Sequence, residues 1–339
     1  MDFRPPTGRW PRFTVLGVVC AVVLALAPGA IAGSPEDAHA LKARLAPRSL
    51  LLDIAAADGR LVAVGERGHI LFSDDRGATW TQADVPTTAT LTAVFLLDRN
   101  LGWAVGHDAV VLHTADGGRT WTLQRSAPEE ERPLFDVYFA DATHGFAIGA
   151  YGAFLATANG GATWEERRIS EEDVHLHHIA RAASGALFIA AESGTLFRSD
   201  DGGASWRALP SPYKGSLFAT VPLEGKALLL LGLRGHLFRS EDGGESWAAL
   251  DSGTEATLTD GVMLGDGRVV VTGLAGVVLV SEDHGRTFAV HQQQARQGIV
   301  AVAPAGDGAI ALAGEFGVRT MAAAEIAAQG GAPKGERTP

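Results

Sequence analysis

Four titratable side chains occupy one position of a repeated pattern, where together they could bind a cation. Two residues after each member of a regularly spaced column of leucine or isoleucine, the chain carries Asp53, Asp136, His178 and Asp260, and alanine fills the other three places. Carboxylate oxygens and imidazole nitrogens are common ligands of divalent cations. The same side chains could instead bond to neighbouring backbone groups or face water. The sequence leaves both interpretations open, and we assign neither a metal site nor any other cofactor.

Other residue types offer little further chemistry. His175, His177 and His178 are close in sequence, but His175 and His177 have no two further ligands nearby at a recognised metal-site spacing. The single cysteine, Cys20, lies in an apolar run near the N-terminus. Disulfide and thiol chemistry are therefore not expected beyond residue 32.

These side chains must be positioned by a repeat that ends in an aromatic residue. Its pattern is Ser/Thr-x-Asp-x-Gly-x-Thr/Ser-Trp, and its aromatic ends fall at positions 80, 121, 164, 206, 247 and 288, the last being phenylalanine. Successive ends are 41, 43, 42, 41 and 41 residues apart. A period in the low forties is typical of propellers and solenoids. We call the six copies box turns: 73–80, 114–121, 157–164, 199–206, 240–247 and 281–288.

The residue types of the box turn predict a turn that bonds to itself. The hydroxyl of serine or threonine and the carboxylate of aspartate sit on short side chains, so each can bond to nearby backbone N–H groups. Glycine permits a positive φ, and the closing aromatic ring can bury a large apolar area. We therefore predict a structural role for the following box residues, with Asn159 replacing aspartate in the third copy: Asp75, Trp80, Asp116, Trp121, Trp164, Asp201, Trp206, Asp242, Trp247 and Asp283.

A glycine-rich hairpin precedes each box turn, and a seventh hairpin at 314–317 has no box turn after it. The column residues also number seven: Leu51, Leu91, Leu134, Leu176, Leu217, Leu258 and Ile299. Each of the first six repeats contains four short runs typical of antiparallel strands, and the seventh contains three. We predict an all-β, seven-bladed β-propeller over residues 49–321, with box turns between strands three and four. The hairpins within every repeat disfavour a parallel solenoid.

The two ends of the chain differ from the repeats. Residues 1–32 combine a basic start, an apolar run at 13–27 and Ala30-Ile31-Ala32, which predicts a signal peptide cleaved after Ala32. An uncleaved anchor is the alternative. Because the seventh repeat lacks a fourth strand, we predict that residues 38–47 of the lead segment 33–48 return to pair there, with 322–328 as the alternative. We expect residues 322–339 to be a flexible tail.

Charge excludes one class of partner. Removing three arginines and one aspartate with residues 1–32 leaves 25 basic and 38 acidic residues, a formal charge of −13. Non-specific binding to nucleic acid needs a basic face, so we expect no nucleic-acid partner. We expect an exported, periplasmic monomer that is at most peripheral to the membrane.

The turns of a propeller alternate between two faces, so the glycine-rich hairpins should lie opposite the box turns. The hairpin turns vary from repeat to repeat, whereas the box turns hardly change. Variable loops on a rigid scaffold commonly carry binding. We predict a partner-binding surface on this hairpin face, formed by Arg67, His107, Asp108, Tyr151, Glu192, Arg234 and Phe316.

The box turns resemble the Asp-box, or bacterial neuraminidase, repeat. This resemblance implies a glycoside hydrolase, either sialidase-like or glucanase-like, as an alternative function. Sialidases use an arginine trio and a tyrosine nucleophile paired with glutamate. Tyr151 and Glu192 lie one repeat apart, but no arginine trio is expected to converge, and Arg168-Ile169-Ser170 lacks the proline of the sialidase start motif. We therefore assign no catalytic residue and predict a protein that is not an enzyme.

A second resemblance rests on residues 134–141 (Leu-Phe-Asp-Val-Tyr-Phe-Ala-Asp) and 144–149 (His-Gly-Phe-Ala-Ile-Gly). Over 49–321 the chain resembles the photosystem II stability/assembly factor family of Asp-box propellers. The resemblance implies an exported, non-catalytic propeller that holds a membrane-protein subunit during assembly. The arginine-rich patch of that family is matched only by the hairpin position of Arg67 and Arg234. We predict a scaffold that binds the exported part of a membrane protein or complex.

Overall fold

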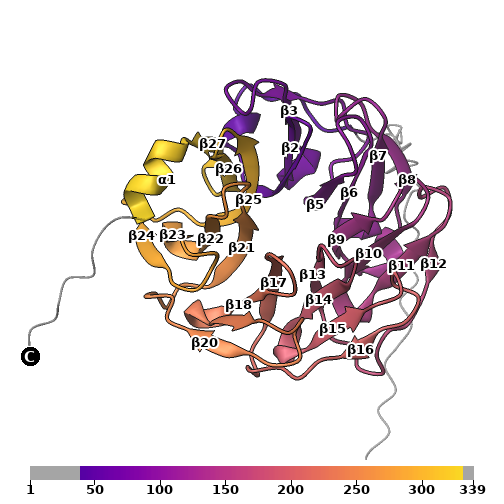
Figure 1. Cartoon of the computed structure of the whole chain (residues 1–339). Helices are drawn as coiled ribbons and strands as arrows, with labels where there is room; N and C mark the ends of the chain where they lie inside the picture. The colour runs from indigo at the N-terminus through magenta and orange to yellow at the C-terminus, as the bar shows by residue number, and fades with distance from the viewer. Residues whose placement is uncertain (1–38, 331–339) are drawn as a thin grey trace, which may run out of the picture.

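Seven antiparallel sheets surround a central axis in the computed structural model, which describes residues 39–330 (Figure 1). Six sheets have four strands and one has three, each in chain order from the axis outward. The prediction of an all-β, seven-bladed propeller is confirmed. Because strands in each sheet are antiparallel, turns between strands two and three emerge on the face opposite the box turns.

The strands of blades one to four have the following bounds: β1 (Leu51–Ala57), β2 (Arg60–Gly65), β3 (Ile70–Ser73), β4 (Thr81–Gln82); β5 (Leu91–Leu96), β6 (Gly102–Gly106), β7 (Val111–Thr114), β8 (Thr122–Arg125); β9 (Leu134–Phe139), β10 (Gly145–Gly149), β11 (Phe154–Thr157), β12 (Glu165–Glu166); β13 (Leu176–Arg181), β14 (Leu187–Ala191), β15 (Leu196–Ser199), β16 (Arg207–Ala208). Blades five to seven comprise β17 (Leu217–Pro222), β18 (Leu228–Gly232), β19 (Leu237–Ser240), β20 (Ala248–Leu250); β21 (Leu258–Met263), β22 (Val269–Gly273), β23 (Val277–Ser281), β24 (Ala289–Gln292); β25 (Ile299–Gly306), β26 (Ala309–Gly314) and β27 (Gly317–Met321).

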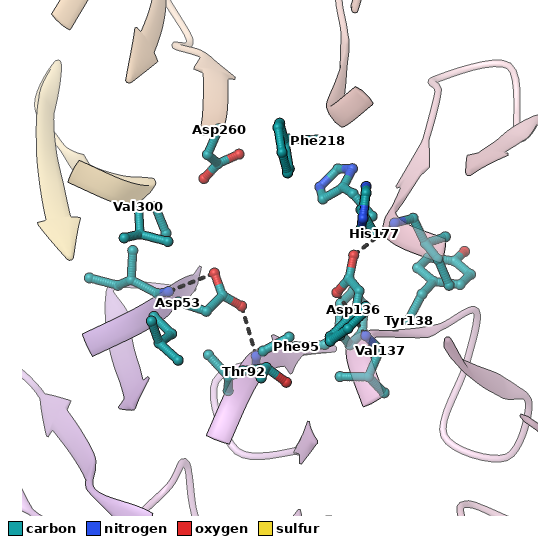
Figure 2. A pocket seen from close by; sticks show the side chains of 18 of the residues that line it. Asp53, Thr92, Phe95, Asp136, Val137, Tyr138, His177, Phe218, Asp260 and Val300 are labelled. Atoms are coloured by element: carbon teal, nitrogen blue, oxygen red, sulfur yellow. Dashed lines mark hydrogen bonds between the residues drawn. The ribbon is translucent and has the colours of Figure 1, made fainter. Parts of the chain in front are cut away.

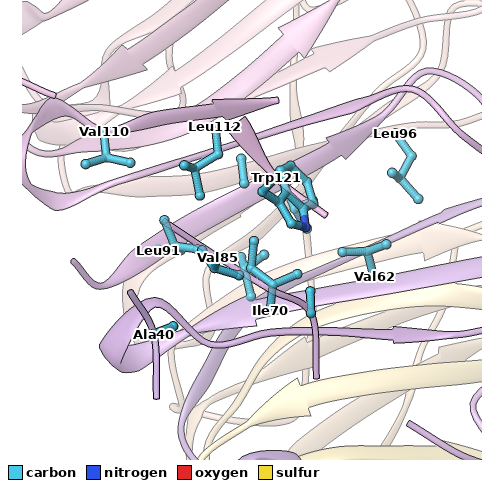
Figure 3. Close-up of a cluster of buried hydrophobic side chains, with 13 residues drawn as sticks. Ala40, Val62, Ile70, Val85, Leu91, Leu96, Val110, Leu112 and Trp121 are labelled. Carbon is cyan, nitrogen blue, oxygen red and sulfur yellow. The ribbon is translucent and has the colours of Figure 1, made fainter. Parts of the chain in front are cut away.

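Apolar side chains on both faces of each sheet pack against the neighbouring blades. The second strands are fully buried, as in β6 and β14, which fits their nearly continuous apolar sequences. Between blades one and two, Val62 and Ile70 pack against Leu91, Leu112 and the box-turn ring of Trp121 (Figure 3). The core is therefore a ring of layers between blades.

The ring closes without the predicted fourth strand in blade seven. Blade seven has three strands among the described residues. Residues 40–43 of the lead segment lie along blade one, and residues 46–48 then contact β27 of blade seven without forming a strand. Ala40 donates its N–H to the carbonyl of Val85, and the Gln82 side chain bonds to the backbone of Leu41 and Ala43. The prediction that 38–47 supplies the outer strand of blade seven is wrong, because the backbone of residues 40–43 bonds to the outer edge of blade one.

Side-chain packing closes the ring instead. Leu51, Ile54 and Leu61 of blade one share a buried cluster with alanines of blade seven, including Ala303 and Ala311. The innermost strands β1 and β25 lie side by side (Figure 1).

The alternative closing segment is not a strand either. Residues Ala323–Gly330 form the helix α1, and Ile326 is buried beside Val280 and Met321. The expectation of a flexible tail is therefore wrong for residues 323–330. The predicted signal peptide, residues 33–38 and residues 331–339 lie outside the described residues. Within residues 39–330, no helix has both the length and the apolar character needed to span a membrane.

Candidate functional site

The hairpin turns display one side chain per blade through an unusual backbone conformation. Each hairpin turn has two central residues between its strands. In six blades the first of the two has φ between 54° and 58°: Arg67, Asp108, Tyr151, Ser193, Arg234 and Ala275. A glycine with positive φ follows in five of them, and Ala109 in the other. Two consecutive positive φ values define a type I′ turn, whose twist suits a hairpin. Each of these non-glycine residues occupies the left-handed region at a cost of about 1–2 kcal/mol.

The predicted binding residues are distributed around the hairpin face. Arg67, His107, Asp108, Tyr151 and Arg234 are exposed, while Glu192 and Phe316 are partly exposed. Most lie on separate blades without mutual contact; Phe316 instead contacts the Arg319 guanidinium, 4.2 Å from its ring centre. Tyr151 and Glu192 are connected through His175, which meets the Tyr151 ring at 4.9 Å and donates its backbone N–H to Glu192.

Five rings form a row on the hairpin face, which we call the aromatic row: Tyr151, His175, Phe135, His177 and Phe218. Successive ring centres along it are 4.9, 6.0, 6.1 and 5.2 Å apart. Tyr151 is 58% exposed, and the other four rings are partly exposed. Sequence reasoning missed Phe135 and Phe218. Each directly follows a column leucine, which was the available signal.

His177 is held neutral within this row. Its Nδ1–H donates to the carbonyl of Leu217 in the next blade at 2.8 Å. Burial lowers the pKa of His177, with a smaller opposing effect of that hydrogen bond. The neutral ring stacks on Phe218 at an interplanar angle of 19°. The row therefore presents apolar ring surface.

Two cavities flank the aromatic row. The central channel contains a cavity of about 460 Å³, lined by Phe135, His177 and Phe218 together with three aspartates (Figure 2). A second cavity of about 420 Å³ lies against Tyr151, with Arg132 and Arg168 among its lining residues. A row of partly exposed rings between two cavities is suited to binding a chain with side chains of different size.

The channel aspartates bond to backbone groups and connect blades. Asp53 accepts N–H bonds from Ile54 at 2.7 Å and, across the blade boundary, from Val94 at 2.8 Å. The equivalent cross-blade bonds run from Ile179 to Asp136 at 2.7 Å and from Val302 to Asp260 at 2.9 Å. Among residues 39–330, no three His, Cys, Asp or Glu side chains gather closely enough to hold a metal ion. These contacts support the backbone-bonding interpretation.

Enclosure in the channel raises the pKa of these carboxyl groups. Burial raises the pKa of Asp136 to about 7, against two opposing backbone hydrogen bonds. Burial, and then the nearby Asp136 carboxylate, raise the pKa of Asp53. Burial likewise raises the pKa of Asp260.

The raised pKa of Asp136 predicts a pH-dependent stability. A group whose pKa is higher in the folded state stabilises it below the unfolded pKa of about 4 and loses that contribution as pH rises through about 7. We expect the melting temperature to fall less between pH 6 and 8 in Asp136→Asn than in the wild type. Asp141→Asn is the control, because hydrogen bonds from Thr143 lower the pKa of Asp141. Parallel melting curves for wild type and Asp136→Asn would contradict the assignment.

The box turns bond internally. Asp75 accepts the backbone N–H of Thr79 at 2.9 Å and its hydroxyl at 2.6 Å, and Ser73 bonds to both Asp75 and the Gly77 N–H. Hydrogen bonds from Thr79 lower the pKa of Asp75 to about 2. The other box turns repeat these contacts, with Asn159 taking the place of aspartate. The box rings of Trp121 and Phe288 are buried, whereas those of Trp80, Trp164, Trp206 and Trp247 are partly exposed.

An arginine cluster lies on the box-turn face. Arg60, Arg99 and Arg119 each place a guanidinium nitrogen 2.8–2.9 Å from the carboxylate of Asp74. Arg60 has a side chain only 1% exposed, and both Arg60 and Arg119 pack over Phe72. Three arginines thus converge, but not beside Tyr151 and Glu192, where a sialidase-type site would need them. These arginines surround a carboxylate of the chain itself, on the face opposite Tyr151 and Glu192.

These features define a class of protein: a box-turn β-propeller with one nearly invariant face and one variable, partly aromatic face. The particular family follows from a sequence comparison. The chain belongs to the family described as "Photosynthesis system II assembly factor YCF48", whose model matches residues 38–130 and 125–263, more than half of the chain.

Individual relatives match over short stretches. The photosystem II assembly protein Ycf48 of Thermosynechococcus vestitus is 45% identical over 42 residues, 12% of either chain. The photosystem II stability/assembly factor HCF136 of Cyanidioschyzon merolae is 38% identical over 80 residues, 22% of this chain and 18% of its own length. The chain thus matches less than a quarter of each of these relatives.

Solved structures share the fold. A structure of YCF48 bound to a D1 peptide superposes with a TM-score of 0.67 at 19% identity, covering 80% of this chain and 93% of the other. A streptogramin B lyase superposes with a TM-score of 0.70 at 14% identity, covering 81% and 93%. At these identities the likeness concerns the propeller alone.

Proposed function

We propose that this protein is a non-catalytic scaffold whose hairpin face binds a segment of a membrane protein or membrane complex during assembly. One observation carries the proposal: the hairpin turns hold different exposed side chains on a rigid ring, beside a partly exposed aromatic row. Membership of the YCF48 family supports an assembly role. The structural relative bound to a D1 peptide supports a peptide-like partner.

The contrast between the two faces favours the hairpin face. On the box-turn face, the repeated hydroxyl and carboxylate groups are occupied by bonds within each turn. On the hairpin face, Tyr151 exposes an aromatic ring from a conformation that non-glycine residues adopt at a cost. Exposed aromatic side chains in well-packed surroundings are typical anchors of protein interfaces.

The proposal includes export. The basic start, apolar run and small-residue site at residues 1–32 support secretion to the periplasm, where the propeller acts as a monomer at the membrane surface. The client segment is then the exported part of its protein. Glycoside hydrolysis is less well supported, because the converging arginines lie on the face opposite Tyr151 and Glu192 and are already neutralised in part by Asp74.

A photocrosslinking experiment tests the proposal. A photoreactive phenylalanine analogue at position 151 is expected to crosslink a membrane protein when the full chain is incubated with detergent-solubilised membranes. The same analogue at Ala204, an exposed residue of a box turn, is the matched control and should give no adduct. The decisive readout is the mass of the adduct. Adducts from Ala204 alone, or from neither position, would refute the hairpin face as the binding surface.

A further inference from the structure

The channel mouth on the hairpin face has an uneven lining. Phe135, His177 and Phe218 directly follow column leucines at the start of β9, β13 and β17, where the chain enters from the hairpin face. The same cavity is lined on other blades by the smaller or aliphatic side chains of Leu52, Thr92, Thr259 and Val300. Aromatic surface therefore covers one side of the mouth, over blades three to five.

Three carboxyl groups lie just below these rings, and burial raises the pKa of each. Asp53, Asp136 and Asp260 are one residue deeper on their strands, and all three line the same cavity (Figure 2). In the described part of the chain, none of the three forms an ion pair with lysine or arginine. Arg181 also lines the cavity, but it ends β13 at the opposite end from Leu176 and is associated with Tyr138. The mouth thus has a floor of carboxyl groups that pair with no lysine or arginine among the described residues, and a cation placed above them favours their ionised form.

The approach to the mouth is also acidic. Glu171, Glu172 and Asp173 are exposed on the connection between blades three and four, and Arg168 pairs with Asp173 alone among them. Glu192 borders His175. Clefts lined by one sign of charge attract ligands of the opposite sign. Aromatic ring faces also attract cations, most strongly where water is partly excluded.

We propose that this channel mouth binds the arginine or lysine side chain of an extended client segment. The inference rests on the proposed function, since the cationic side chain is that of the client. The cation lies over the faces of Phe135, His177 and Phe218, above the three carboxylates. The remainder of the segment follows the aromatic row outward to Tyr151, a path of about three to seven extended residues. The cavity of about 460 Å³ has room for one long side chain.

Peptide binding to the full chain tests this inference. The probes are fluorescein-labelled Gly-Ser-Leu-Arg-Leu-Ser-Gly amide and the same peptide with citrulline, which keeps the shape of arginine without its charge. By fluorescence anisotropy at low salt, we expect the arginine peptide to bind about tenfold more tightly. In the double variant Phe135→Leu/Phe218→Leu, the preference should fall to about threefold or less. Val290→Ala, which changes an exposed residue on the outer strand of blade six, should keep the full preference.

The outcomes separate the two proposals. Equal affinity for the two peptides, or binding of neither, overturns the cation site even if position 151 still crosslinks a membrane protein. If the double variant does not fold, the comparison of the two peptides on the wild type, together with Asp53→Asn, decides the matter. Asp53→Asn should weaken the arginine peptide and leave the citrulline peptide unchanged. An unchanged arginine affinity in Asp53→Asn also counts against the site.

Discussion

Replacing Trp103 by alanine is expected to lower the free energy of unfolding by about 3–5 kcal/mol. The side chain is fully buried and stacks on Phe139, with ring centres 3.4 Å apart and an interplanar angle of 6°. Its indole N–H donates to the carbonyl of Gly160 in the box turn of the next blade. The substitution therefore leaves a large cavity between blades two and three and removes a hydrogen bond across the same boundary.

Chemical denaturation of paired variants measures this effect. Trp103→Phe keeps most of the ring and loses the hydrogen bond, so its loss should be about 1–2 kcal/mol. Trp164→Ala changes a half-buried box-turn ring that meets Phe139 edge-on at 5.9 Å, and its loss should be about 2 kcal/mol. A smaller effect at Trp103 than at Trp164 would show that the interface between the blades relaxes around the cavity.

Replacing Asp74 by alanine should lower the free energy of unfolding by about 3 kcal/mol. The substitution leaves three guanidinium groups together, and Arg60 has only 1% exposure. Removing one partner of a buried ion pair usually costs about 3–5 kcal/mol, and we place the value at the lower end because Asp74 is 43% exposed. Since the loss is largely charge repulsion, it should shrink as ionic strength rises.

Asp200→Ala is the matched control for Asp74→Ala. Asp200 occupies the same position before a box aspartate, but among the described residues its side chain pairs only with Arg198. We expect a loss below about 1 kcal/mol there, with weaker dependence on salt. Equal losses in the two variants, or no effect of salt on Asp74→Ala, would contradict the proposed repulsion.

The repeating part of the fold could be predicted because one local pattern specifies it many times. Each box turn needs a hydroxyl, a carboxylate and glycine at fixed spacing, and the bonds of Ser73 and Asp75 show why those types recur. The number of blades follows from counting copies, and the two faces follow from the antiparallel order of the strands.

The parts without a repeat could not be predicted in this way. The lead segment and α1 follow contacts unique to their surroundings, such as Ala40 with Val85 and the burial of Ile326. The arginine cluster brings Arg60 and Arg99 from different blades to one carboxylate, which single-sequence spacing does not reveal. The aromatic row depends on Phe135 and Phe218 lining the same end of the central channel. Predicting this would require knowing which end of each strand lies on the hairpin face.

The way the ring closes has a consequence for the termini. Among the described residues, blade seven completes the circle without borrowing a strand from either end of the chain. Proteolytic trimming or genetic fusion at the amino terminus therefore leaves every hydrogen-bonded ladder of the wheel untouched. Such changes keep the body of the molecule intact only where they spare Ala40 and Ala46, which are buried against the blades.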